Sequence, residues 1–367
     1  MSGPDSRPIL VMAGGTGGHV YPALAVARAL QAQSQQVVWL GTQRGLEARI
    51  VPAAGIDIEW ISARGLRRKG LLALILAPLQ LFWSLLQALG VILRRRPAAV
   101  LGMGGYASGP GGVAAWLTRR PLVIHEQNAA AGLTNRLLAR LARVVLQAFP
   151  GSFNSSVDAL TVGNPVRDDI AAVPEPGARY PGREGPLRLL VLGGSQGALS
   201  LNRTVPAALA LLPADLRPVV RHQAGERTID IARDAYAASD IDVELLPYIE
   251  DMASTYAWAD LVICRAGALT VAEICAVGLP ALFVPYPSAV DDHQTKNATP
   301  LVDAGAATII PEKDLTENTL SGFLRDWLLE RPELQARAEK ARSLAIPDAL
   351  ERITSTVVRA ASAGARP

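Results

Sequence analysis

The sequence contains little cysteine, and this scarcity limits the classes of protein to consider. Only Cys264 and Cys275 occur among 367 residues, and they do not form a CxxC pair. A disulfide framework and a zinc site therefore have no support, and a reducing compartment is expected. The N-terminal residues are polar and lead directly into an apolar segment, so no secretory signal is visible.

The first glycine-rich loop, residues 14–19 (GGTGGH), lacks the lysine of a Walker A loop. It also fails the G-x-G-x-x-G fingerprint, because Val20 stands where the third glycine belongs, and this disfavours a dehydrogenase. The apolar run Ile9–Met12 nonetheless predicts a buried strand before the loop, and a helix is predicted from Pro22 onward. Glycines let a backbone approach a ligand, and a helix N-terminus attracts negative charge. The loop is therefore predicted to hold an anion.

Acidic residues are scarce in the first half of the chain. Residues 1–165 carry a net charge of +10, whereas residues 166–367 carry −7. The basic half favours an anionic surface or ligand on its side, although a plain surface asymmetry stays open. Neither an aromatic-interleaved basic run nor a nucleic-acid motif is present, so nucleic acid is not an expected partner.

Charged residues are absent from residues 71–93, which as a helix would extend about 35 Å, enough to cross a bilayer. Pro78 would interrupt one uniform helix, and Gln80, Ser84 and Gln87 form a single polar stripe. Both flanks are basic, so no positive-inside bias selects an orientation. We interpret the segment as one or two helices lying on the domain, with apolar residues for a membrane surface and arginines for anionic headgroups. A plain buried helix and a true span stay open. The flanking cations are Arg64, Arg67, Arg68, Lys69, Arg94, Arg95 and Arg96.

The plan of the first loop recurs twice. Leu189–Leu192 predicts a strand that runs into the glycine loop 193–198 (GGSQGA) and then a helix, and residues 101–117 again combine a strand, glycines and a helix. Glycines also serve tight chain reversal, but three such loops favour ligand binding. Strands alternating with helices predict an α/β protein with two parallel sheets, whose ligands belong at the carboxyl ends of the strands. The other predicted strands are Val37–Leu40, Leu122–His125, Val144–Gln147, Val219–His222, Leu261–Cys264 and Ala281–Pro285.

The organisation suggests a boundary near residues 162–169, before a Pro/Gly-rich loop at 174–186. We expect an N-terminal domain at 1–165, a C-terminal domain at 166–345, and a final helix and tail at 346–367. The final helix is expected to pack back on the first domain.

The densest polar motif spans residues 259–298. A predicted strand ends at Arg265, and residues 268–273 open a helix whose N-terminus can hold a diphosphate. Glu273 lies one turn further in, where its carboxylate can accept hydrogen bonds from ribose hydroxyls. A helix N-terminus followed by a carboxylate indicates a nucleotide-sugar site. It resembles the C-terminal domain of GT-B glycosyltransferases, in which two Rossmann-like domains face each other across a cleft.

Seven strings occur in order from Ile9 to beyond Ala307: GGTGGH, GMGGYASGP, HEQNAAAGLTNR, GNPVR, GGSQGA, RAGALTVAE and DDHQTKNA. They resemble the family of bacterial cell-wall N-acetylglucosaminyltransferases that convert lipid I into lipid II. The resemblance implies an inverting transfer from UDP-N-acetylglucosamine to the muramoyl 4-hydroxyl of undecaprenyl-pyrophosphoryl-N-acetylmuramoyl-pentapeptide. It also implies peripheral attachment to the cytoplasmic side of the cell membrane, with no cofactor and no metal.

The resemblance also implies the donor contacts. The family pattern has small departures at Ser288, where histidine is common, and at Ala131, where proline is common, and these affect loop shape more than donor binding. The implied donor-binding residues are Thr16, Gly17, Gly18, Asn128, Arg167, Ser195, Ile249, Ala268, Leu269, Thr270, Val271, Ala272, Glu273 and Gln294.

Two residues are candidates for the catalytic base that deprotonates the acceptor hydroxyl. His19 closes the first glycine loop at a helix N-terminus, which favours a neutral imidazole. The same histidine could instead bind the diphosphate of the acceptor. Glu126, just beyond a predicted strand, is the second candidate. Asp291 and Asp292 are adjacent rather than spaced as Asp-x-Asp, and are interpreted as a solvated acidic turn.

Three other functions stay open from the sequence. A UDP-sugar epimerase would share the donor and a similar fold, but it needs no apolar surface patch. A glycosyltransferase acting on diacylglycerol would differ in its lipid acceptor. A nucleotide-binding membrane scaffold would leave His19 and Glu126 without a role, and UDP release would exclude it.

Overall fold

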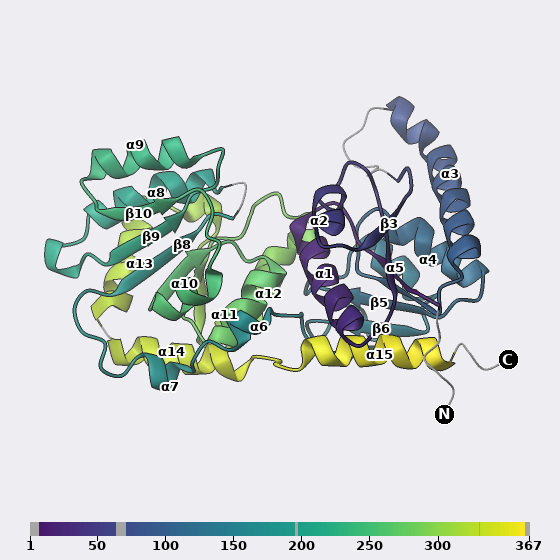
Figure 1. Cartoon of the computed structure of the whole chain (residues 1–367). Helices are drawn as coiled ribbons and strands as arrows, with labels where there is room; N and C mark the ends of the chain where they lie inside the picture. The colour runs from purple at the N-terminus through teal and green to yellow at the C-terminus, as the bar shows by residue number, and fades with distance from the viewer. Residues whose placement is uncertain (1–6, 64–70, 195–196, 330, 364–367) are drawn as a thin grey trace. The chain divides into compact units, whose positions relative to one another are not determined.

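Two parallel sheets organise the chain. The structure, a computed structural model, describes residues 7–63, 71–194, 197–329 and 331–363 (Figure 1). It divides into a first unit, Met1–Pro165 with Asp348–Pro367, and a second unit, Val166–Pro347. Each unit is an α/β fold around its own sheet, which confirms the predicted fold class of two Rossmann-like parallel-sheet domains.

The first sheet has seven parallel strands in the order β3-β2-β1-β4-β5-β6-β7. The chain order reverses between β1 and β4, whose paired ends are Met12 and Gly102. Loops leave the carboxyl ends of these neighbouring strands in opposite directions, and such a switch point is where parallel sheets bind ligands. The strands are β1 (Ile9–Met12), β2 (Val37–Gly41), β3 (Asp57–Trp60), β4 (Ala99–Gly102), β5 (Leu122–Glu126), β6 (Val144–Gln147) and β7 (Ala159–Thr161).

Alternate residues of β1 enter opposite cores, because successive side chains of a strand point to opposite faces. Ile9 and Val11 join the core of α1 and α15, whereas Leu10 and Met12 join the core of α3 and α4. The final helix, α15, thus packs on the first sheet, as predicted (Figure 1). The helices of this unit are α1 (Gly17–Ala32), α2 (Glu47–Ala53), α3 (Leu71–Arg95), α4 (Ser108–Leu117), α5 (Leu133–Leu138) and α15 (Ala349–Ala363).

The second sheet has six parallel strands in the order β10-β9-β8-β11-β12-β13, with its switch point between β8 and β11. Its strands are β8 (Arg188–Leu192), β9 (Val219–Gln223), β10 (Val243–Leu246), β11 (Leu261–Cys264), β12 (Ala281–Phe283) and β13 (Ala307–Ile309). Its α-helices are α6 (Asp168–Ala171), α7 (Pro176–Arg179), α8 (Leu199–Ala210), α9 (Ile229–Ser239), α10 (Met252–Trp258), α11 (Ala268–Val277), α12 (His293–Asp303), α13 (Glu317–Leu329) and α14 (Arg331–Ser343). Short 3-10 helices lie at Ala214–Leu216, Val290–Asp292 and Glu312–Asp314.

The start of α1 differs from the sequence prediction, and the structure decides between the alternatives left open for α3. Helix α1 begins at Gly17 rather than at Pro22, so the second half of the first glycine loop is helical and Thr16 is the N-cap residue. Pro22 therefore lies inside the helix, as its sixth residue, where its missing N–H leaves out one intrahelical hydrogen bond. Helix α3 is one continuous helix that contains Pro78, which is the first of the two predicted alternatives, one helix or two.

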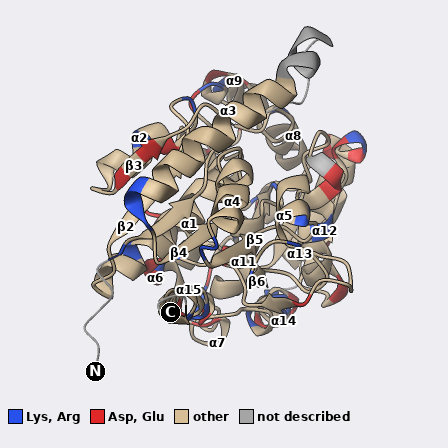
Figure 2. Ribbon diagram, turned by 90° about the vertical axis from the view of Figure 1, so that its right-hand side faces the viewer, with Lys and Arg blue, Asp and Glu red and all other residues tan. Residues whose placement is uncertain are grey.

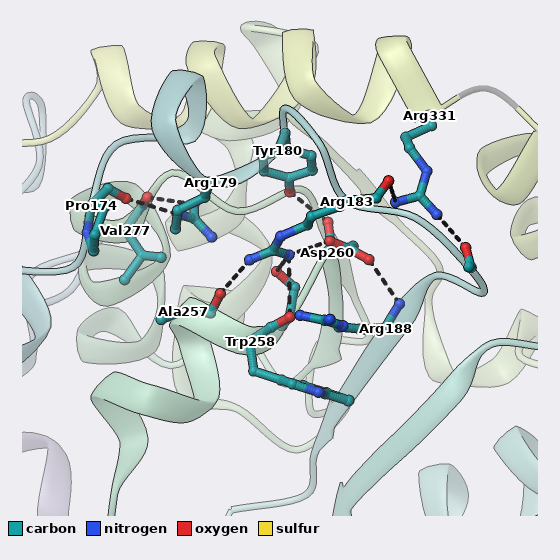
Figure 3. Close-up of polar contacts among 12 residues, drawn as sticks. Pro174, Arg179, Tyr180, Arg183, Arg188, Ala257, Trp258, Asp260, Val277 and Arg331 are labelled. Carbon is teal, nitrogen blue, oxygen red and sulfur yellow. Dashed lines mark hydrogen bonds and ion pairs between the residues drawn. The ribbon is translucent and has the colours of Figure 1, made fainter.

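A buried polar cluster holds the segment before β8 against the rest of the second unit (Figure 3). The Tyr180 hydroxyl donates to the Asp260 carbonyl oxygen at 2.6 Å, and the Arg188 N–H donates to Asp260 Oδ2 at 2.9 Å. Arg183 forms an ion pair with the Asp260 carboxylate, whose side chain is 1% exposed. Arg179 donates to the carbonyl oxygens of Val277 and Gly278. The stretch 174–186, predicted as a loop, contains the short helix α7 and is anchored to the residue before β11 and the end of α11.

We expect Arg183→Met to destabilise the second unit by about 3 kcal/mol or more, because it leaves the buried Asp260 carboxylate without its cation. Native-state hydrogen exchange of the β8 and β11 amides measures this loss. Arg233→Met is the control, since the Arg233–Asp230 pair is solvent-exposed, and it should change stability by about 0.5 kcal/mol or less. Equal effects of the two variants would contradict the assignment of Arg183 as a buried anchor.

Candidate active site

The first glycine loop, residues 14–19, meets the glycine motif that follows β4 at the switch point of the first sheet. Gly104 and Gly105 both have positive φ, at 91° and 83°. A Cβ atom on Gly104 would lie 2.6 Å from His19 Cδ2, and one on Gly105 would lie 2.7 Å from the Gly14 nitrogen. Ser108 Oγ fixes this contact by donating to the carbonyl oxygens of Met12 and Gly104, at 3.0 and 2.7 Å. The His19 imidazole thus lies against the backbone of the third motif.

Three predicted donor residues form the N-terminus of α1. Thr16 is the extended N-cap residue, and Gly17 and Gly18 make the first turn with His19, whose N–H donates to the Thr16 carbonyl oxygen at 3.1 Å. Thr16 and Gly18 are exposed, and His19 is partly buried. Because the first N–H groups of a helix have no partner within the helix, this end is suited to an anion.

Glu126 occupies a different environment from a free general base. Its side chain is buried, and both carboxylate oxygens accept hydrogen bonds. Oε1 accepts from the backbone N–H and Nδ2 of Asn128, at 3.0 and 3.2 Å, and Oε2 accepts from the Gly132 N–H and Asn135 Nδ2, at 3.1 and 2.9 Å. This geometry favours a role in shaping the 126–135 loop, and with it the predicted donor residue Asn128, over proton transfer.

His125, next to it, is a structural residue. It is fully buried, and burial lowers the pKa of its imidazole to about 4. Its Nε2 lies 2.9 Å from the Gly163 carbonyl oxygen, and its Nδ1 lies 3.0 Å from Gln127 Nε2. These contacts hold a neutral ring between β5 and the end of the first unit.

The second glycine loop leaves β8 at the switch point of the second sheet. Predicted residue Ser195 lies outside the described residues, and the structure shows only its surroundings. Gly197 has a φ of 78°, and buried Asn202 donates through Nδ2 to the carbonyl oxygen of Ala224 at 3.0 Å and to Thr228 Oγ1 at 3.0 Å. The Asn202 hydrogen bonds therefore tie the first turn of α8 to the segment after β9.

The predicted residues 268–273 form the first turns of α11, after the N-cap residue Gly267. The Arg265 side chain fixes the backbone just before this helix. Its guanidinium donates to the carbonyl oxygens of Val284 and Pro285, at 2.9 and 3.2 Å, and pairs with Glu312. Asn297 Nδ2 donates to the Ala266 carbonyl oxygen at 3.1 Å. The N-terminus of α11 is thus rigidly placed at the carboxyl end of β11.

Glu273 has the most perturbed carboxyl group at this site. Burial raises its pKa to about 6, while the Tyr256 hydroxyl, which donates to Oε2 at 3.0 Å, and the charge of Arg167 act in the opposite direction. Arg167 is the N-cap residue of α6 and is half exposed beside Asp169. Tyr256 is fully buried and was not singled out from the sequence, because an isolated tyrosine in a helix carries no signal of its partner.

The remaining predicted donor residues of the second unit are Gln294, in the first turn of α12, and Ile249, in the loop after β10. Gln294 Oε1 accepts from the Tyr286 N–H at 2.8 Å. The Ile249 side chain is buried, and its N–H donates to Gln223 Oε1 at 3.1 Å, so a uracil contact through this N–H would replace that bond. Asp291 and Asp292 are exposed with positive φ, in agreement with the predicted acidic turn.

The predicted residues thus fall into two groups, each in its own unit. The first unit brings Thr16, Gly17, Gly18 and His19 together at the start of α1. Glu126 is the last residue of β5, which ends one residue later than predicted, and Asn128 follows it in the next loop. In the second unit, Arg167 lies within electrostatic range of Glu273.

Comparison with known proteins identifies the family. The glycosyltransferase family 28 N-terminal domain matches residues 9–147, and the family 28 C-terminal domain matches residues 188–353. The chain belongs to glycosyltransferase family 28. This agrees with the resemblance found in the sequence motifs.

Close family 28 relatives cover almost the whole chain. A UDP-N-acetylglucosamine–N-acetylmuramyl-(pentapeptide) pyrophosphoryl-undecaprenol N-acetylglucosamine transferase from Alkalilimnicola ehrlichii is 61% identical, over 94% of this chain and 96% of the relative. Its namesake from Marinobacter nauticus is 51% identical, over 99% of this chain and 100% of the relative. The crystal structure of MurG from Acinetobacter baumannii is 40% identical, with a TM-score of 0.85, over 96% of this chain and 99% of that chain.

We expect Tyr256→Phe to raise the pKa of Glu273 above about 6, because the lost hydrogen bond favours the ionised carboxylate. Carboxyl ¹³C NMR of glutamate-labelled protein measures this titration. Tyr236→Phe is the control, since that hydroxyl bonds His222 instead. An unchanged titration in Tyr256→Phe would contradict the assigned contact.

The same raised pKa makes stability depend on pH. Between about 4.5 and 6 the folded protein keeps a proton on Glu273 that the unfolded chain loses. This carboxyl therefore reduces stability as the pH rises through that window, and Glu273→Gln should remove its contribution.

Proposed function

We propose that the chain transfers N-acetylglucosamine from UDP-N-acetylglucosamine to the muramoyl 4-hydroxyl of undecaprenyl-pyrophosphoryl-N-acetylmuramoyl-pentapeptide, forming lipid II for peptidoglycan. The observation that carries the proposal is the N-terminus of α11 at a switch point, followed one turn later by Glu273, which Tyr256 holds in place. This is the chemistry that a nucleoside diphosphate needs. The names of the family 28 relatives supply the sugar and the acceptor.

In the proposed donor complex, the N–H groups of α11 hold the diphosphate and Glu273 accepts hydrogen bonds from the ribose hydroxyls. Gln294 and Asn128 present neutral amides to the sugar hydroxyls and the acetamido group. As the anomeric bond breaks, negative charge grows on UDP, and the oriented amides stabilise it without reorganising. The remaining proposed contacts are Thr16, Gly17, Gly18, Arg167, Ser195, Ile249, Ala268, Leu269, Thr270, Val271 and Ala272.

We favour His19 over Glu126 as the base for the attacking hydroxyl. The four hydrogen bonds to Glu126 occupy both of its carboxylate oxygens, and the side chain is buried, so neither oxygen is presented to an acceptor hydroxyl. His19 lies at the exposed end of α1, where a helix N-terminus favours the neutral imidazole. Attack from the face opposite UDP then inverts the anomeric centre.

An apolar helix face supports attachment to the cytoplasmic side of the membrane. In α3 two polar side chains contact Ser62 of the same unit: Ser84 donates to the Ser62 carbonyl oxygen at 3.3 Å, and Gln87 Oε1 accepts from the Ser62 N–H at 2.7 Å. Gln80, the third residue of the polar stripe, is exposed. Apart from Gln80 and Arg94, the exposed residues described in α3 are apolar, and in Figure 2 the described ribbon of α3 carries no charged colour until its C-terminal end. We call this surface the α3 patch, formed by Leu79, Leu81, Phe82, Trp83, Leu86 and Leu93.

Segment Ala77–Arg95 of α3 is long and apolar enough to cross a membrane, by length and composition alone. Its mean hydropathy is 1.3, and 28% of its most apolar stretch is buried. Its end is tied to the first unit, because Arg94 and Arg95 form ion pairs with Glu59, and Arg95 also pairs with Asp57. These bonds and the Ser62 contacts support a helix that lies on the surface rather than one that spans. Because Arg94 and Arg95 are paired with Glu59 and Asp57, they are less available to lipid headgroups than was predicted from the sequence.

Purified protein given UDP-N-acetylglucosamine, with and without a lipid I analogue, tests the transfer. We expect UDP release that depends on the acceptor, with a new β-linked disaccharide. His19→Ala should lower turnover by on the order of a hundredfold or more, with little change in UDP affinity. Release without acceptor would indicate an epimerase or hydrolase, and donor binding without release would indicate a scaffold. Normal turnover in His19→Ala would remove it as the base.

Vesicle binding tests the membrane proposal. The double variant Phe82→Ser/Trp83→Ser should bind vesicles of phosphatidylglycerol and phosphatidylethanolamine at least about tenfold more weakly, since burying each large apolar side chain stabilises by roughly 1.5–3 kcal/mol. Leu211→Ser/Leu329→Ser removes two equally exposed apolar residues from the second unit and serves as the control. Equal binding by both double variants would refute the α3 patch as the docking surface.

A further inference from the structure

Glu47 is a fully buried carboxylate beneath the first glycine loop. It is the first residue of α2, and three hydrogen bonds converge on it. Oε2 accepts from the Gly15 N–H at 2.9 Å, while Oε1 accepts from the Thr42 N–H at 3.0 Å and from Thr42 Oγ1 at 2.8 Å. One side chain therefore ties the loop after β1 to the loop after β2.

Three glycines make room for this carboxylate. A Cβ atom on Gly14 would lie 2.5 Å from Glu47 Oε1, and one on Gly41 would lie 2.9 Å from Glu47 Cγ. A Cβ atom on Gly45 would also collide with the carboxylate. The glycines thus serve the approach of a side chain of the protein, not only the approach of a ligand.

The position of Glu47 changes the meaning of the GGTGGH loop. Its Gly14–Gly15 turn already surrounds a carboxylate, and the Gly15 N–H is already used. A second anion in this turn would lack that donor and lie close to a like charge. An anionic ligand is therefore directed to the other half of the loop, the N-terminus of α1 from Thr16 to His19.

We infer that Glu47 is a positioning residue for the acceptor: it fixes the Gly14–Gly15 turn so that the N-terminus of α1 and His19 present a constant geometry to the diphosphate-linked sugar. This inference rests on the proposed transfer function. Two further bonds brace the same turn, from Trp39 Nε1 to the Ala13 carbonyl oxygen at 2.9 Å and from the Leu46 N–H to the Gly15 carbonyl oxygen at 3.4 Å. Glu47 is the only one of these braces that is a buried carboxylate at the centre of the turn.

Glu47→Gln tests the inference with almost no change in shape. All three partners of the carboxylate are donors, so the amide keeps one accepting oxygen and turns its NH₂ toward a donor. We expect kcat/KM for the lipid I analogue to fall on the order of tenfold to a hundredfold, as for a small misplacement of catalytic groups. The dissociation constant of UDP-N-acetylglucosamine should stay within about twofold, since only three of the proposed donor contacts, Thr16, Gly17 and Gly18, adjoin the turn that Glu47 fixes and most of the others lie in the second unit.

Glu59→Gln is the matched control, because Glu59 is another hydrogen-bonded carboxylate of the first unit but pairs with Arg94 and Arg95. It should leave both constants unchanged. Thr42→Val removes one bond to Glu47 and should give a smaller loss of the same kind. Should Glu47→Gln fail to fold, Thr42→Val carries the test. A purely structural role predicts that acceptor and donor constants worsen together with the thermal midpoint, and this result, or an unchanged acceptor constant, would overturn the inference.

A failure of the proposed function is recognised separately. If the wild-type protein releases no UDP in the presence of acceptor, the transfer itself is wrong. Hydrogen exchange at the amides of Thr16 to His19 then tests the positioning alone. Faster exchange in Glu47→Gln than in Glu59→Gln supports it, and equal exchange overturns it.

Discussion

Parallel strand pairing is the constraint on which the other features depend. Every strand of both sheets runs in the same direction as its neighbours, so the loops that follow the strands gather at one edge of each sheet. At the two switch points this edge presents the N-termini of α1 and α11. In the first unit, the hydrogen bond from Ser108 to Gly104 helps to hold the start of α1. In the second unit, the bonds of Arg265 and Asn297 hold the start of α11.

How far the sequence predicts the fold depends on the position of each strand in its sheet. The central strands are continuous apolar runs buried on both faces, and β1, β6 and β11 have the bounds that the pattern predicts. The strands that escaped prediction, β3, β7, β10 and β13, are the edges of the two sheets. They are short and only partly buried, so their sequences carry both polar and apolar residues and lack a continuous run. The start of α1 was also misplaced, because glycines in a first turn resemble a loop.

The residues of the candidate site also differ in how far the sequence predicts them. Glycine loops and helix N-termini are local features, and the sequence was enough to single out His19 and the turns of α11. Glu47, Tyr256 and the closed environment of Glu126 depend on partners that other segments supply, such as Gly15 for Glu47 and Glu273 for Tyr256. A single sequence contains these residues but not the pairs. Their roles became visible only once the fold had brought the pairs together.

The placement of α15 has a consequence for how the chain is made. Its residues Ile353 and Val357 complete the core that contains Ile9 and Val11, so the first unit is assembled from both ends of the sequence. The second unit is continuous and has all of its residues as soon as Pro347 has left the ribosome. During synthesis the first unit is therefore the last to be completed. The face of α1 that packs on α15 stays uncovered until α15 has been synthesised.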